Sequence, residues 1–446
     1  MSPRKPSDPR VAPARSSSDE PTFGVPDAAR PDYLPGQYIV RLHPAAIRES
    51  LTQDLLPGAI EPIEHLRRNA GLTSMEPLMR GRGVRSERAV PSDPTARDRR
   101  ALLDSVADIE HDLAGITIAH LDPASAAETV DRARSSRAID FIERVPARWL
   151  SAARGERPDP RENPQWNLRA IRWYHAPEVD AGEQTVGIID SGIDAAHPDL
   201  DDVDLTYDHA GSGAADILGH GTHVAGIVAA RTNARRGTTG VAGCRVHLWK
   251  TFTDAPADDG GYYVDPSMFA DALRAAETAG ITSLNLSLGG PASSRVEELL
   301  IRRLIDAGVV VVAAMGNEYE AGNPTFYPAA YDGVLAVGAL TETGERAAYS
   351  NTGDHIGLSA PGSNVLSTLP RDASPERAER HYGVWSGTSM ATPHVSAAAA
   401  LVAAARPGVA GIGVRERLLA TARTRPRGGS AAAYGAGSLD LAAALS

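Results

Sequence analysis

Three short glycine-containing segments each carry one member of the set Asp, His and Ser. In chain order they are GIIDSG at 187–192, GHGTHVAG at 219–226 and SGTSMATPH at 386–394. These three side chains together convert an unreactive hydroxyl into a nucleophile for acyl transfer. The order Asp, His, Ser also separates this set from two other known orders of the same triad. The sequence therefore predicts a serine hydrolase with Asp190, His220 and Ser389 as catalytic residues.

Asp190 and Ser389 each also have a simpler interpretation. Asp190 is predicted to end a buried strand, where a carboxylate can orient an imidazole, but Asp is also common in surface turns. Ser389 is predicted to begin a helix that runs to about residue 405, where a serine is usually an N-cap. Pro393 is expected in the first turn of that helix, where its missing N–H is tolerated. The co-occurrence of all three segments favours catalysis.

A second histidine, His223, follows His220 by one helical turn. The pair alone is compatible with a metal site, but it lacks the intervening Glu of the zinc-peptidase motif and no third ligand is signalled nearby. We therefore expect His220 to act as the general base and His223 to make a buried hydrogen bond.

The three segments resemble those of the subtilisin-like (subtilase, peptidase S8) family. The resemblance spans roughly residues 164–440, and a weaker one to the family's inhibitory pro-domain precedes it. It implies a serine endopeptidase that works by an Asp-His-Ser charge-relay mechanism through an acyl-enzyme and processes itself. Two alternatives remain at this stage: an esterase or acyl transferase with the same triad, and a catalytically silent binding module on the same fold.

The resemblance also implies residues that bind the substrate. Asn317, in AAMGNE, matches the family's oxyanion-hole segment and would act with the N–H of Ser389. The residues Ser287, Leu288 and Gly289 match the strand edge that pairs with an extended peptide. Phe326 falls at the floor of the pocket for the side chain before the scissile bond, the P1 pocket. There it would favour small or medium side chains; the alternative is that it packs in the core.

Alternating apolar runs and helical patterns predict the fold class α/β: a mostly parallel sheet flanked by helices, preceded by a small α+β unit. The resemblance implies that the sheet is subtilisin-like and that the smaller unit is the family's pro-domain. The strands expected in the sheet are 185–190, 245–250, 282–288, 309–314 and 333–339. The helices expected around it are 220–230, 267–279, 294–307 and 389–405. Strands at 37–42, 116–121 and 139–145 and helices at 101–113 and 124–135 are expected before it, with a loop at 67–100.

Composition shifts, together with what the resemblance implies, divide the chain into four parts. These are a disordered lead-in at 1–34, the pro-domain at 35–150, a linker and processing region at 151–164, and the catalytic domain at 165–446. The linker is rich in Arg, Pro, Gly and Glu, which indicates an accessible site for cleavage. We expect the cut between Leu150 and Asn163. The alternative is an N-terminal domain that stays attached.

Charge and composition limit the partners. The net charge is −11, and nearly all of it falls after residue 165, which argues against a nucleic-acid partner. No apolar stretch is long enough to span a membrane. The expected partners are polypeptide substrates and the chain's own pro-domain. The resemblance implies secretion. However, no signal peptide is visible, so the start as given implies the cytoplasm.

No cofactor is expected to take part in the chemistry. Cys244 is the single cysteine, so an intrachain disulfide is excluded, and its apolar setting predicts a core residue. The resemblance raises a structural calcium ion, for which Asp199 matches one ligand position. However, the loop 231–240 carries Arg235 and Arg236, which are unfavourable beside a divalent cation.

Overall fold

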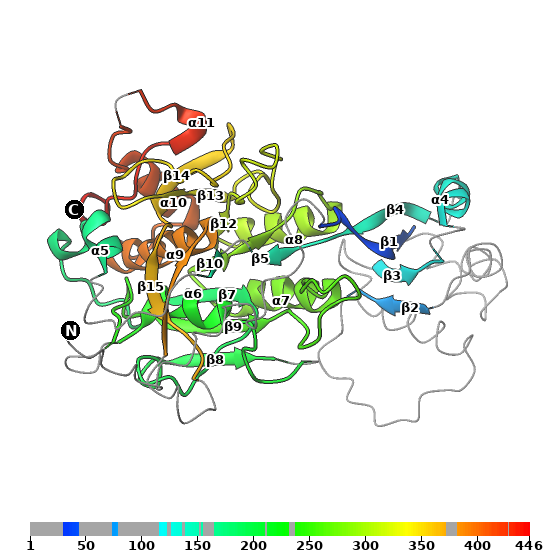
Figure 1. Cartoon of the computed structure of the whole chain (residues 1–446), viewed down its shortest axis with the longest axis horizontal. Coiled ribbons are helices and arrows are strands. Elements are labelled where there is room, and N and C mark those ends of the chain that lie inside the picture. Colours follow the sequence, from blue (N-terminus) through cyan, green and yellow to red (C-terminus); the bar gives the residue numbers. More distant parts are fainter. Residues whose placement is uncertain are drawn as a thin grey trace, which may run out of the picture.

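A parallel sheet of seven strands lies at the centre of residues 165–446 in the computed structural model (Figure 1). The structure describes residues 30–43, 74–78, 116–122, 126–135, 139–150, 153–154, 165–209, 212–231, 237–371, 381–426 and 428–446. The strand order is β14-β13-β12-β10-β7-β9-β8, and every neighbouring pair in it is parallel. The strands are β7 (Thr185–Asp190), β8 (Leu205–Asp208), β9 (Arg245–Lys250), β10 (Ser283–Leu286), β12 (Val310–Ala314), β13 (Leu335–Leu340) and β14 (Ile356–Pro361).

The central strands are buried on both faces, as their apolar runs predict. Every residue of β12 is buried, and its Val and Ala side chains suit a strand with helices on either side. Helices α6 (His220–Ala229) and α9 (Thr388–Ala405) lie on one side of the sheet, and α7 (Pro266–Thr278) and α8 (Arg295–Asp306) on the other (Figure 1). The α9 helix is buried from Thr388 to Val402 and carries apolar side chains on every side beside a few polar ones, which is typical of a helix in a large core.

The remaining elements of this region surround the sheet. The helices are α5 (Trp166–Ala170), η2 (Trp173–His175), α10 (Gly411–Ala420), α11 (Ala431–Tyr434) and α12 (Leu441–Leu445). The short strands are β11 (Leu288–Gly289), β15 (Val365–Thr368) and β16 (Tyr382–Ser386). Three adjacent strands, β12, β10 and β7, end at one rim of the sheet, which brings the segments after them together.

The N-terminal residues form a separate four-stranded antiparallel sheet, in the order β2-β3-β1-β4. Its elements are β1 (Tyr33–Leu42), β2 (Ser74–Pro77), β3 (Ile116–His120), α4 (Ala126–Arg134) and β4 (Ile139–Pro146). The β2 strand lies where we expected only a loop, because a four-residue strand among Arg, Gly and Pro has too weak a pattern to predict. The helix expected at 101–113 and most of the lead-in at 1–34 lie outside the described residues.

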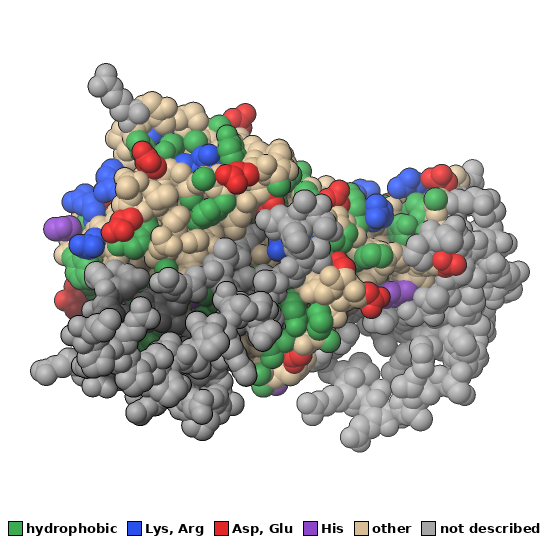
Figure 2. All heavy atoms as spheres, in the orientation of Figure 1, with side chains coloured by type: hydrophobic (Ala, Val, Ile, Leu, Met, Phe, Trp, Pro, Cys, Tyr) green, Lys and Arg blue, Asp and Glu red, His purple; other side chains and the backbone are tan. Residues whose placement is uncertain are grey.

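Two short strands connect the N-terminal sheet to the larger region. They are β5 (Trp149–Leu150), which pairs with β11, and β6 (Ala153–Arg154), which pairs with β16. On the face seen in Figure 2, acidic and basic side chains of the described residues are interspersed and form no large field of one sign. Among the helices of the described part, none is both long and apolar enough to cross a membrane.

Candidate active site

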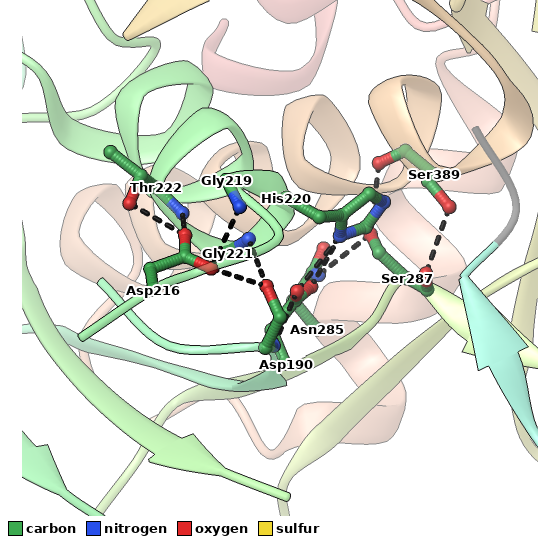
Figure 3. A network of polar contacts seen from close by, with 10 residues as sticks. Asp190, Asp216, Gly219, His220, Gly221, Thr222, Asn285, Ser287 and Ser389 are labelled. Carbon is green, nitrogen blue, oxygen red and sulfur yellow. Dashed lines mark hydrogen bonds and ion pairs between the residues drawn. The ribbon is translucent and has the colours of Figure 1, made fainter. Parts of the chain in front are cut away.

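Asp190 and His220 meet at the rim of the sheet. Asp190 is the last residue of β7, and His220 is the first residue of α6; both are fully buried. The Nδ1 atom of His220 lies 2.8 Å and 3.0 Å from the two carboxylate oxygens of Asp190. Because a carboxylate only accepts, Nδ1 carries the proton and Nε2 is the basic nitrogen. The ring lies between Asp190 and Ser389 (Figure 3).

A second carboxylate, Asp216, holds the start of α6 in place. It is buried, and it accepts from the Ser191 hydroxyl (2.8 Å) and the Gly219 N–H (2.9 Å) through Oδ1. Its Oδ2 accepts from the N–H and hydroxyl of Thr222, at 2.9 Å and 2.7 Å (Figure 3). An anion at a helix N-terminus satisfies backbone donors that the helix leaves unpaired. Asp216 therefore fixes the turn on which His220 stands, a role that we did not predict.

Ser389 is the second residue of α9 and forms a reciprocal pair with Ser287. Its hydroxyl donates to the Ser287 carbonyl at 2.8 Å, and the Ser287 hydroxyl donates to the Ser389 carbonyl at 2.8 Å (Figure 3). Pro393 lies inside α9, beyond the first turn in which we expected it. It removes the N–H that would normally bond to the carbonyl four residues earlier, which is that of Ser389. The Ser287 hydroxyl takes the place of this donor, and the Asn285 side chain supports it at 2.9 Å.

Asn317 follows β12 and lies against the residue before Ser389. Its Oδ1 accepts from both the N–H and the hydroxyl of Thr388, at 2.9 Å and 3.0 Å. The Asn317 N–H donates to the Glu318 carboxylate at 2.6 Å. Because the two ends of a planar amide lie on opposite sides, holding Oδ1 also fixes the direction of the donating Nδ2. Gly316, at φ +96°, makes the turn that allows this, and a Cβ there would meet Glu318 at 2.7 Å.

The edge formed by Ser287 and β11 is occupied by the chain itself. The β5 strand (Trp149–Leu150) pairs antiparallel with β11 (Leu288–Gly289), so that Leu150 is opposite Leu288. On the other side of this segment, the Arg148 carbonyl accepts from the Val264 N–H at 3.0 Å. Residues 148–150 therefore lie extended between two backbone edges, next to Ser287, whose carbonyl contacts the Ser389 hydroxyl.

Phe326 is fully buried between two glycines of this site. A Cβ at Gly289 would clash with its ring, and one at Gly316 would lie 2.9 Å from it. The ring also meets Trp149 edge to face, with centroids 5.9 Å apart. Phe326 thus packs against both the strand edge and the Asn317 loop. Packing in the core is therefore compatible with the predicted position at the floor of the P1 pocket.

His223 and Cys244 are two other residues considered from the sequence, and both pack inside the protein. His223 is fully buried, its Nε2 lies 3.1 Å from the Gly383 carbonyl, and its ring stacks on Trp385 with centroids 4.8 Å apart. Burial lowers the pKa of His223 to about 3. Cys244 is buried as expected, and burial raises the pKa of its thiol to about 12.

The described part of the calcium candidate makes hydrogen bonds within the protein. Asp199 uses Oδ2 to accept from the Thr238 N–H at 2.8 Å and the Tyr382 hydroxyl at 3.0 Å. Within the described residues, no group of three or more His, Cys, Asp or Glu side chains is arranged to hold a metal. Arg235 and Arg236 lie outside these residues. Because the loop at 231–240 is only partly described, a calcium ion beside Asp199 stays a prediction.

Comparisons with known proteins identify relatives of this chain. Subtilisin from Bacillus pumilus is 35% identical over 282 residues, which cover 60% of this chain and 94% of that protein. Subtilisin DY from Bacillus licheniformis is 39% identical over 264 residues, covering 58% of this chain and 89% of that one. The major intracellular serine protease of Bacillus subtilis is 36% identical over 247 residues, with 52% and 73% covered.

The fold is also that of a solved structure. Fervidolysin from Fervidobacterium pennivorans, described as a keratinolytic enzyme related to subtilisin, matches with a TM-score of 0.69 at 22% identity. The match covers 95% of this chain and 62% of that one. The model of the subtilase family (peptidase S8) matches residues 182–437, more than half of the chain. The chain belongs to the subtilase family and is a subtilisin-like serine peptidase.

Proposed function

We propose that the protein is a serine endopeptidase in which Ser389 attacks the peptide carbonyl and His220 takes its proton. The Asp190 carboxylate keeps the proton of the ring on Nδ1 and stabilises the imidazolium that forms. His220 then gives its proton to the leaving amine, and water hydrolyses the acyl-enzyme by the same route in reverse. The observation that carries this proposal is the buried contact of 2.8 Å between Asp190 and His220, beside the Ser389 side chain.

The developing oxyanion needs donors that are already in place. We assign this role to the side-chain amide of Asn317 and the backbone N–H of Ser389. The two hydrogen bonds from Thr388 to Asn317 support the assignment, because they fix the amide before a substrate arrives. Donors fixed in this way cost no reorganisation during the reaction.

A peptide substrate is favoured over a simple ester by the edge at Ser287 and β11. Leu288 and Gly289 pair through their backbone with residues 149–150, so the same edge suits the main chain of an extended peptide. Main-chain pairing gives affinity independent of side chains. An esterase or acyl transferase with the same triad needs no such edge.

The N-terminal residues 35–150 are proposed to act as a pro-domain that occupies the cleft until the chain cuts itself. Support comes from residues 148–150, which lie between Val264 and β11 in the manner of a bound peptide. A cut between Leu150 and Asn163 would release this segment from the catalytic domain. In the uncut chain, the same pairing would block other substrates.

The test compares the wild-type chain with Ser389→Ala. We expect the wild type to yield a shorter product whose new N-terminus lies between residues 151 and 163, and to cleave peptides. Ser389→Ala should remain full length and inactive. Cleavage of peptides by Ser389→Ala, or turnover of esters but no peptides by the wild type, would refute the proposal.

A further inference from the structure

The most unusual feature of the occupied cleft is an arginine buried beside the strand edge. Arg148 is 1% exposed, and it lies two residues before Leu150, the residue that pairs with Leu288. Its Nη2 donates to the Glu297 carboxylate at 2.6 Å and to the Ala292 carbonyl at 2.7 Å. A guanidinium is thus held by a carboxylate and a carbonyl away from water.

Glu297 belongs to the larger region and is itself prepared for this contact. It stands in the first turn of α8 and is 8% exposed. The hydroxyl of Tyr331 shares its proton between the Ser294 carbonyl at 3.0 Å and the same carboxylate oxygen at 3.3 Å, and it accepts from the Ser294 N–H at 2.7 Å. Tyr331 thus reaches the carboxylate from within the larger region, while the Ser294 hydroxyl donates to Glu143 of β4 at 2.8 Å.

The surroundings make the charge pair selective. The pocket around Arg148 carries charge, among its described lining residues, only on Arg148 and Glu297. Ile39, Leu78 and Val145 of its apolar lining belong to the N-terminal residues. Val264, Phe269 and Leu300 belong to the larger region and still line the subsite when the N-terminal residues leave. If a peptide places an apolar or acidic side chain in this pocket, the Glu297 carboxylate is removed from water without a partner. This loss of solvation costs free energy and disfavours such a peptide. The planar guanidinium also reaches the Ala292 carbonyl with the same nitrogen.

We propose that Glu297 and the Ala292 carbonyl form an arginine-binding subsite of the substrate cleft. It selects peptides with Arg two residues before the residue that pairs with Leu288. The proposal rests on the endopeptidase function above and adds the class of substrate. Arg148 marks the subsite because the chain's own segment fills it as a substrate would.

The test uses two peptides with the sequence of residues 146–154, one unchanged and one with citrulline in place of the arginine at position 148. Citrulline keeps the shape and removes the charge. We expect the active wild type to cleave the arginine peptide with a kcat/KM at least about 30-fold higher, as the loss of one partner of a buried charge pair implies. Glu297→Gln should reduce this ratio to near 1 while still cleaving the citrulline peptide.

Glu298→Gln is the matched control. Glu298 is the next residue on α8 and pairs with Arg302, so this variant should keep the full preference for arginine. Equal cleavage of both peptides by the wild type would refute the subsite and leave the protease function standing; the ion pair would then only fasten the N-terminal segment. A wild type that cleaves neither peptide nor a denatured protein would refute the proposed function, and the subsite with it.

Discussion

Replacing Asp216 with Asn is expected to damage the active site without touching the triad. The carboxylate accepts from Ser191, Gly219 and Thr222, and two of these donors are backbone N–H groups that cannot reverse their direction. The substitution replaces one of the two carboxylate oxygens with an NH₂ group. In either orientation of the side chain, this NH₂ group faces a backbone N–H, that of Gly219 or that of Thr222. One buried backbone donor is therefore left without an acceptor.

The cost follows from these contacts. An unsatisfied buried donor costs about 1–3 kcal/mol. The lost charge at the N-terminus of α6 adds about 0.5–2 kcal/mol in a buried setting. Together these costs imply that Asp216→Asn lowers the free energy of unfolding by about 1.5–5 kcal/mol. Because His220 begins the same turn, a shift of its ring should also lower kcat about 10²-fold.

Urea unfolding, measured in a Ser389→Ala background to prevent self-digestion, gives the change in stability. Peptide hydrolysis, measured with Ser389 intact, gives the change in kcat. The exposed Asp202→Asn is the control and should alter neither. A loss of under about 1 kcal/mol with unchanged kcat would show that Asp216 does not position the helix.

Three further predictions concern the residues around the triad. Burial lowers the pKa values of His223 and His394 to about 3 and about 4, so the unfolded state binds more protons below pH 6.5. Stability should therefore fall by about 2–3 kcal/mol per histidine between pH 6.5 and 4.5, and His223→Gln should flatten this loss in unfolding curves; parallel curves would contradict it. Asn317→Ala should lower kcat about 10²–10³-fold with KM little changed, and an unaltered kcat in steady-state assays would remove Asn317 from the oxyanion hole. Phe326→Ala should shift a peptide library toward larger P1 side chains, whereas a strong wild-type preference for Phe or Tyr would show that Phe326 does not shorten the pocket.

Local patterns were sufficient for much of the sheet. The strands expected at 185–190 and 245–250 coincide with β7 and β9. The run from Val186 to Ile189 marks a strand buried on both faces, whereas in β9 the buried Val246 and Leu248 alternate with the less buried Arg245 and His247. The α6 helix likewise begins at His220, directly after Gly219, which lies in the left-handed region at φ +78°. These features depend on neighbouring residues alone.

Features that depend on distant partners were not predictable. Asp216 resembles any acidic residue in a turn until the three residues that donate to it are seen around it. Arg148 and Glu297 are 149 positions apart, and neither is distinguished by its neighbours. The role of Pro393 also needed the structure, because the donor that replaces its missing N–H comes from Ser287. Tertiary contacts decide all three.

The most direct test of the mechanism is the mass of the chain after reaction with an organic fluorophosphonate, which phosphonylates an activated serine hydroxyl. The account predicts one adduct per active molecule, located on Ser389 by peptide mass spectrometry, much slower in His220→Ala and absent in Ser389→Ala. An adduct on another serine, or peptide hydrolysis that persists when Ser389 is fully modified or replaced, would contradict it.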